Sequence, residues 1–111
     1  MSILKVDYGD IGGGWQLNPT LSDHYTGART TSTMKTFTID TSKHYILVLT
    51  YRYNDTTYRT TTYYVADGAC TLFGGNQSTT DLTPTLSGTS LSVSGGTASN
   101  VNNDLSLIQL D

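Results

Sequence analysis

Tyrosine and arginine side chains concentrated between residues 49 and 65 are the part of this sequence best suited to binding chemistry. The stretch reads LTYRYNDTTYRTTTYYV and holds five tyrosines and two arginines among threonines. Aromatic rings stack on sugar faces, while Asn, Asp and Arg offer planar hydrogen-bonding groups. The stretch and a tryptophan upstream therefore predict a carbohydrate-type site. The stacking residues would be Trp15, Tyr51, Tyr53 and Tyr58, and the residues that hold hydroxyl groups would be Arg52, Asp55 and Arg59.

The same residues also have a purely structural interpretation. Tyrosine and threonine are good strand residues, and tyrosine rings can cover a thin core. Trp15 follows three glycines, so it is either a ligand platform, a plug over the open end of a sheet sandwich, or a contact to a neighbouring subunit. These alternatives remain open at the level of sequence.

Catalytic and metal-binding patterns are missing from the sequence. The chain contains no glutamate, no Gly-x-Ser-x-Gly, no His-Glu-x-x-His and no phosphate-binding loop. His24 and His44 are too far apart for a metal site defined by spacing, and Asn100 to Asp104 lacks a calcium-loop pattern and is interpreted as a polar turn. The one cysteine, Cys70, is interpreted as a small buried hydrophobic residue. We expect no enzyme activity, no cofactor and no metal.

Composition restricts the partners. The net charge of −3 and the scattered Lys and Arg residues argue against nucleic acid. No apolar run is long enough for a membrane helix, and MSILKVDYGD is unlike a signal peptide, so synthesis in a cytoplasm is expected. The 111 residues predict one domain, 1–111, with few large aliphatic residues. Such a thin core would gain from burial against another copy, which predicts a homo-oligomer.

Strand-forming residues and turn signals alternate along most of the chain. They predict an all-β, single-domain antiparallel β-sandwich of jelly-roll or immunoglobulin-like type, with a small barrel as the alternative. Residues 15–33 are interpreted as irregular and residues 77–88 as a Ser/Thr-rich connection. The last strand is expected to pair inside a sheet. About seven short strands are predicted, over residues 3–8, 34–40, 44–53, 57–65, 69–73, 89–94 and 104–110.

Residues 44–65 are expected to form a hairpin that turns near Asn54-Asp55. A two-residue turn pairs Tyr51 with Tyr58, and a four-residue loop pairs Arg52 with Arg59. Both registers place Tyr51 and Tyr58 on the same face. The run YILVL within the first strand predicts burial on both faces. The base of the hairpin is expected to be core, and the tip, Tyr51 to Arg59, is expected to be partly exposed.

Three stretches of the chain resemble small β-rich structural proteins of tailed bacteriophages and prophages. These stretches are MSILKVDYG, IDTSKHYILVLTYRYNDTTY and SGTSLSVSGG with the ending LSLIQLD. The resemblance covers most of the chain and lies in strand-and-turn patterning. It implies a virion component, such as a tail appendage, a baseplate part or a head fibre or decoration domain. It also implies a homotrimer, contacts with other virion proteins, and attachment to glycans on the host surface. An assembly module and a carbohydrate-binding module without catalytic activity are therefore the two functional hypotheses.

Overall fold

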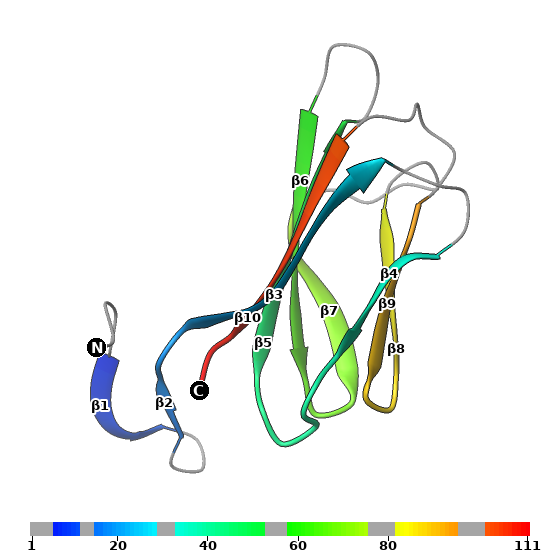
Figure 1. Ribbon diagram of the computed structural model, residues 1–111. Coiled ribbons are helices and arrows are strands. Elements are labelled where there is room, and N and C mark those ends of the chain that lie inside the picture. The colour runs from blue at the N-terminus through cyan, green and yellow to red at the C-terminus, as the bar shows by residue number, and fades with distance from the viewer. Residues whose placement is uncertain (1–5, 12–14, 29–32, 53–57, 76–81, 96–101) are drawn as a thin grey trace.

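The fold consists of strands joined by turns. The computed structural model describes residues 6–11, 15–28, 33–52, 58–75, 82–95 and 102–111 (Figure 1). These residues form the strands β1 (Val6–Ile11), β2 (Trp15–Leu17), β3 (Thr20–Ala28), β4 (Thr33–Thr38), β5 (Tyr45–Arg52), β6 (Tyr58–Ala66), β7 (Ala69–Gly74), β8 (Thr83–Ser87), β9 (Ser90–Ser94) and β10 (Asn102–Gln109).

Two antiparallel sheets face each other in a sandwich. The larger sheet has the order β3-β10-β5-β6-β7 and the smaller one has the order β4-β9-β8. Figure 1 shows the smaller sheet covering one side of the larger sheet, while β1 and β2 form a separate pair away from both. The predicted all-β antiparallel sandwich is confirmed. The last strand, β10, lies between β3 and β5, as its apolar residues predicted.

Three strands fall where the sequence was interpreted as irregular. Residues 15–33, predicted to be irregular, contain β2 and β3, and residues 77–88, predicted to be a connection, contain β8. Both β3 and β8 are edge strands. The residues of β3 give no clear alternation, and β8 contains a proline, which argues against a strand. Pairing with a neighbouring strand sets their conformation, which local propensity does not reveal. Pro84 fits β8 because an edge strand tolerates a residue without an N–H.

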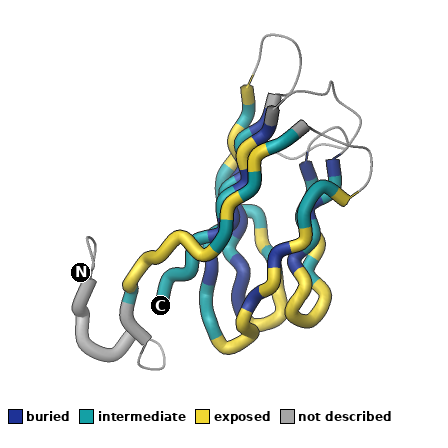
Figure 2. The backbone as a smooth tube through the Cα atoms, viewed as in Figure 1, coloured by how far each residue is buried: buried dark blue, intermediate teal, exposed yellow. Residues whose placement is uncertain are grey.

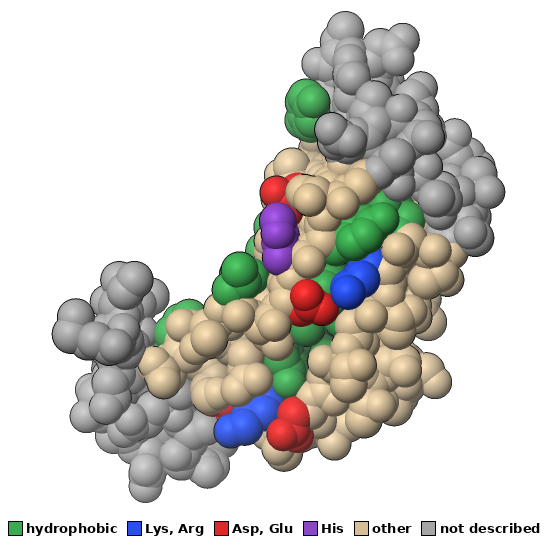
Figure 3. Space-filling model, viewed as in Figure 1, with side chains coloured by type: hydrophobic (Ala, Val, Ile, Leu, Met, Phe, Trp, Pro, Cys, Tyr) green, Lys and Arg blue, Asp and Glu red, His purple; other side chains and the backbone are tan. Residues whose placement is uncertain are grey.

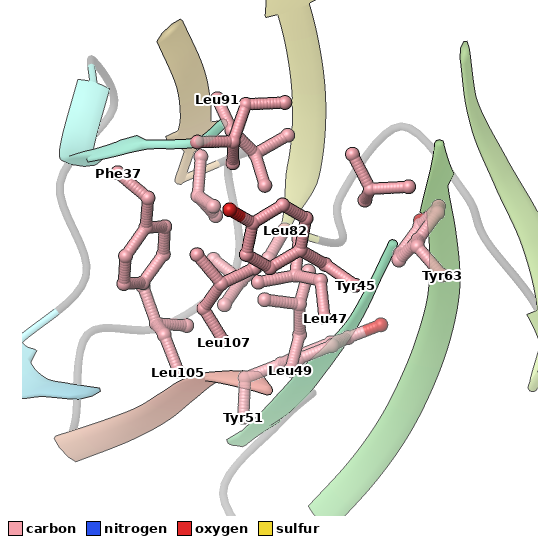
Figure 4. Close-up of a cluster of buried hydrophobic side chains, with 13 residues drawn as sticks. Phe37, Tyr45, Leu47, Leu49, Tyr51, Tyr63, Leu82, Leu91, Leu105 and Leu107 are labelled. Carbon is pink, nitrogen blue, oxygen red and sulfur yellow. The ribbon is translucent and has the colours of Figure 1, made fainter. Parts of the chain in front are cut away.

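The core lies between the two sheets (Figures 2 and 4). Side chains alternate across a strand, so every second residue of β5 and β10 points toward the smaller sheet. The largest fully buried side chain is that of Tyr51. The core cluster comprises Phe37, Ile39, Tyr45, Leu47, Leu49, Tyr51, Tyr63, Val65, Leu82, Leu91, Val93, Leu105 and Leu107.

An ion pair bridges the edge strands β3 and β4, which belong to different sheets. The Lys35 ammonium lies 3.3 Å from the Asp23 carboxylate and 5.4 Å from the centre of the Phe37 ring. The pKa of Asp23 is lowered, first by the hydrogen bond from the His24 N–H and then by Lys35. Charged side chains at sheet edges also discourage pairing with other chains.

The hairpin of β5 and β6 has neither of the predicted registers. Tyr51 pairs with Arg59, and Arg52 pairs with Tyr58. Residues 53–57, an odd number, separate the strands, whereas both predicted loops were even. Changing the loop by one residue transfers every side chain of the second strand to the other face. The predicted faces of β6 were therefore wrong: Thr61, Tyr63 and Val65 point into the core.

Candidate functional site

The structure does not bring the predicted ligand residues together on one surface. Tyr51 points inward, and Tyr58, across the sheet from Arg52, points outward. Arg59 is half-buried opposite Tyr51. Trp15 begins β2 and Arg52 ends β5, but their side chains lie outside the described part of the structure. Tyr53 and Asp55 also lie outside the described residues.

The predicted partial exposure of Tyr51 was wrong. Its side chain is 0% exposed and belongs to the core cluster, whereas Tyr58 is 66% exposed. The difference follows from register, because the odd loop separates the two tyrosines onto opposite faces of one sheet. Among the described residues of the predicted site, Tyr58 alone keeps an exposed aromatic ring.

Four large apolar side chains cross the outer face of the five-stranded sheet, the face turned away from the core. Leu21, Ile108, Ile46 and Tyr64 pair in turn across β3, β10, β5 and β6. We call these four residues the outer apolar row. Leu21 is 60% exposed and the other three are half-buried. Val48, two residues from Ile46 on the same face of β5, adds to this apolar surface. No described strand covers the outer apolar row (Figure 1).

The outer face of the three-stranded sheet has the opposite character. Its outward positions follow from the register, in which Phe37, Leu91 and Leu86 mark the buried face. Every intervening residue of β8 and β9 is a serine or a threonine. The hydroxyl groups of Thr36 and Ser92 lie 3.0 Å apart on this face. Hydroxyl groups form hydrogen bonds with water, so this face is suited to exposure to solvent, unlike the outer apolar row.

A histidine and an aspartate hold one end of the outer apolar row. The ring of Tyr64 stacks on His44, with centroids 6.3 Å apart and planes 17° apart. Asp111 accepts a hydrogen bond of 3.0 Å from the His44 N–H and lies 2.8 Å from ring Nδ1. Partial burial raises the pKa of Asp111, but these hydrogen bonds and the charges of His44 and Lys43 outweigh burial and lower it. Tyr64 is thereby fixed in place.

A second histidine–aspartate pair lies on the same outer face. His24 Nε2 is 2.6 Å from the Asp104 carboxylate, between the neighbouring strands β3 and β10. Both side chains are substantially exposed. His24 lies in the row of paired residues next to the outer apolar row, and Asp104 lies one row further along β10. Figure 3 shows polar and apolar side chains interspersed on the visible surface.

Reactive chemistry has little support among the described residues. Burial raises the pKa of the Cys70 thiol to about 11, so the thiol stays protonated at neutral pH. Cys70 packs against the core but is only partly buried, so the predicted burial is confirmed in part. Within the described ranges, no three His, Cys, Asp or Glu side chains gather as a metal site would require.

The outer apolar row was not predicted from the sequence as a site. Its signal was the run YILVL, which predicted burial on both faces of one strand. In this chain Leu47 and Leu49 are buried, but Ile46 and Val48 are only half-buried. The prediction therefore fails for the second face of β5. The sequence does not reveal the other members of the row, because only strand pairing brings Leu21, Ile108 and Tyr64 into line with Ile46.

Fold and surface together define an antiparallel β-sandwich with one outer face lined by hydroxyl groups and one crossed by a row of apolar side chains. No helix in the described part of the chain is long and apolar enough to cross a membrane. No protein-family model, curated protein or solved structure matches the chain.

Proposed function

We propose that this protein is a non-enzymatic assembly module that works by binding other copies of itself. The outer apolar row is the observation that carries this proposal. Leu21, Ile46, Tyr64 and Ile108 form a continuous line across four strands where an outer sheet face would normally be polar. Contiguous exposed apolar surface of this kind is typical of interaction sites.

The biological setting that fits this activity best is the virion of a tailed bacteriophage or prophage. Its support is the resemblance in strand-and-turn patterning, together with a compact β-sandwich suited to repeated packing. In that setting the protein would be a tail appendage, a baseplate part or a head fibre or decoration domain, made in the bacterial host cytoplasm. It would contact further copies, with a trimer expected from the resemblance, and other virion proteins.

The oligomeric state in solution tests the assembly function. Light scattering coupled to size-exclusion chromatography should give a mass that is a defined multiple of the 12.0 kDa chain. The multiple should fall on dilution. A mass of one chain at every concentration up to the millimolar range would refute self-assembly. The virion setting is tested separately, by mass spectrometry of purified particles from a host strain that carries the gene.

Carbohydrate binding without catalysis is a second candidate, and the position of Tyr58 favours it. Its ring is 66% exposed at the start of β6, and aromatic rings at a protein surface are groups on which sugar faces stack. Glycan-array binding that disappears in Tyr58→Ala but persists in Tyr64→Ala would support this site. If titration with host wall polysaccharide gives no signal for the wild-type protein, this candidate fails.

A further inference from the structure

We propose that the outer face of the five-stranded sheet binds the same face of a second copy, so that two sandwiches pack sheet to sheet. This inference rests on the proposed assembly function and names its surface, and its two-fold contact makes a dimer where the resemblance alone implies a trimer. The contact centres on β5, the middle strand of the five. Ile46 and Val48 would lie near the two-fold axis, with Leu21 and Tyr64 on either side.

Side-chain alternation in β5 is the first reason. The run YILVL has the composition of a strand buried on both faces, yet the smaller sheet covers only one face. The smaller sheet's own outer face is lined by Ser and Thr. A single chain therefore has one outer face suited to contact with water. On its other outer face, Ile46, Val48 and Ile108 are only partly buried. A second sheet packed about 10 Å away would complete their burial.

The size of the face fits a second copy. Five strands about 4.8 Å apart, which have 6 to 9 residues each at about 3.3 Å per residue, cover roughly 600 Å² in projection. Side-chain relief increases the accessible area beyond this projection. Stable complexes bury about 800 Å² on each partner, so this one face is large enough to form a dimer.

Charge also favours a second copy over a strongly charged partner. In a two-fold contact each surface meets itself, so a patch of one sign would repel its counterpart. The row of pairs next to the outer apolar row consists of His24, Ser106, Val48 and Thr62. The described side chains of these two rows include no cluster of like charges. The carboxylates of Asp104 and Asp111 lie near these rows, and each has a histidine partner, His24 at 2.6 Å and His44 at 2.8 Å respectively.

Charge insertion on the two outer faces tests this contact. Ile46→Glu should raise the dimer dissociation constant at least 30-fold, and the matched variant Ser92→Glu, on the hydroxyl face, should leave it unchanged. Leu21→Glu serves as a second variant, because a side chain on an edge strand that is 60% exposed adds little to monomer stability. Circular dichroism and urea unfolding would establish that each variant is folded.

Cross-linking locates the axis without introducing charge. In a Cys70→Ala background, Val48→Cys should form a disulfide between two copies under mild oxidation, and Ser92→Cys should not. A dimer that persists unchanged in Ile46→Glu and Leu21→Glu, or a trimer in place of a dimer, would overturn this contact and leave the assembly function standing. A wild-type protein that stays monomeric would overturn both.

Discussion

At the scale of single residues, two tyrosines seven positions apart have opposite roles. Tyr51 is buried in the core, and Tyr58 is on the surface. Composition predicted a tyrosine-rich hairpin but not which ring faces water, since that depends on the number of residues in the connecting loop. The aromatic part of the predicted site was therefore only partly predictable from the sequence.

Alanine substitution should separate the two tyrosines. Tyr51→Ala should lower the free energy of unfolding by about 3–5 kcal/mol, because it leaves a large cavity between the sheets. Tyr58→Ala removes an exposed ring and should change it by less than about 0.5 kcal/mol. Urea unfolding at neutral pH measures both. Equal losses in the two variants would contradict the register of this hairpin.

Asp111 should make the stability depend on pH in the acid range. Its folded pKa is lowered from the ordinary value of 3.8 by the hydrogen bonds from His44, which outweigh the effect of burial. A lowered folded pKa stabilises the protein above the unfolded value, and this contribution is lost as pH falls through the folded pKa. Asp111→Asn should therefore be less stable than the wild type at pH 6, and the difference should shrink toward pH 2.5.

Urea midpoints of the two proteins at several pH values check this expectation. Asp23 and Asp40 also have lowered pKa values, but both are present in each protein, so their effect cancels in the difference. If the difference in stability between the two proteins stays constant between pH 6 and pH 2.5, the charge of Asp111 does not contribute to stability.

At the scale of elements, the sequence predicted strands well wherever turn signals bounded them. Asp67-Gly68 is an example, because both residues have positive φ and close the tight turn between β6 and β7. Strand β3 was missed because its nine residues include charged, polar and glycine positions without clear alternation. Pairing with β10 specifies it, and such long-range pairing cannot be deduced from local residues.

A designed disulfide should verify the register of β5 and β6. Thr50 and Thr60 face each other with hydroxyl oxygens 3.3 Å apart, so cysteines there are close enough to bond. In a Cys70→Ala background, Thr50→Cys with Thr60→Cys should oxidise readily within one chain. The control, Thr50→Cys with Arg59→Cys, places the thiols on opposite faces and should stay reduced. Thiol titration under denaturing conditions distinguishes the two results.

Glycine positions after β7 and β8 should respond differently to alanine. Gly75 and Gly88 both have positive φ, which costs an alanine roughly 1–2 kcal/mol. At Gly75 the added carbon would also collide with the Thr60 carbonyl oxygen, whereas at Gly88 no atom lies within 4 Å. Gly75→Ala should thus lose at least about 1 kcal/mol more than Gly88→Ala in urea unfolding. Equal losses would argue against the close approach of Gly75 to β6.

At the scale of the whole molecule, the sandwich and its N-terminal strand pair are distinct parts. Figure 1 shows β1 and β2 apart from the two sheets, and an isolated two-stranded pair is only marginally stable. The Asn18 N–H donates to the Leu110 carbonyl and fixes the point where the chain enters the sandwich. Stability of the sandwich should therefore be independent of the first two strands.

Removal of residues 1–17 should leave the sandwich folded. Strands β1 and β2 pair with each other and belong to neither sheet of the sandwich, so the free energy of unfolding should change by less than about 1 kcal/mol. Thermal and urea unfolding of the shortened chain measure the change. Loss of a cooperative transition would show that the N-terminal segment is required for the fold.

The central position of β10 has a consequence for how the protein is made. During synthesis β3 and β5 leave the ribosome well before the strand that separates them in the finished sheet. Until residues 102–109 arrive, both strands have unpaired backbone edges, and the edge of β5 includes Leu47 and Leu49. Pairing between segments so distant in sequence is slow, and open edges in the meantime favour aggregation. The nascent chain therefore depends on its last strand, and expression should be sensitive to changes in β10 that the finished fold would tolerate.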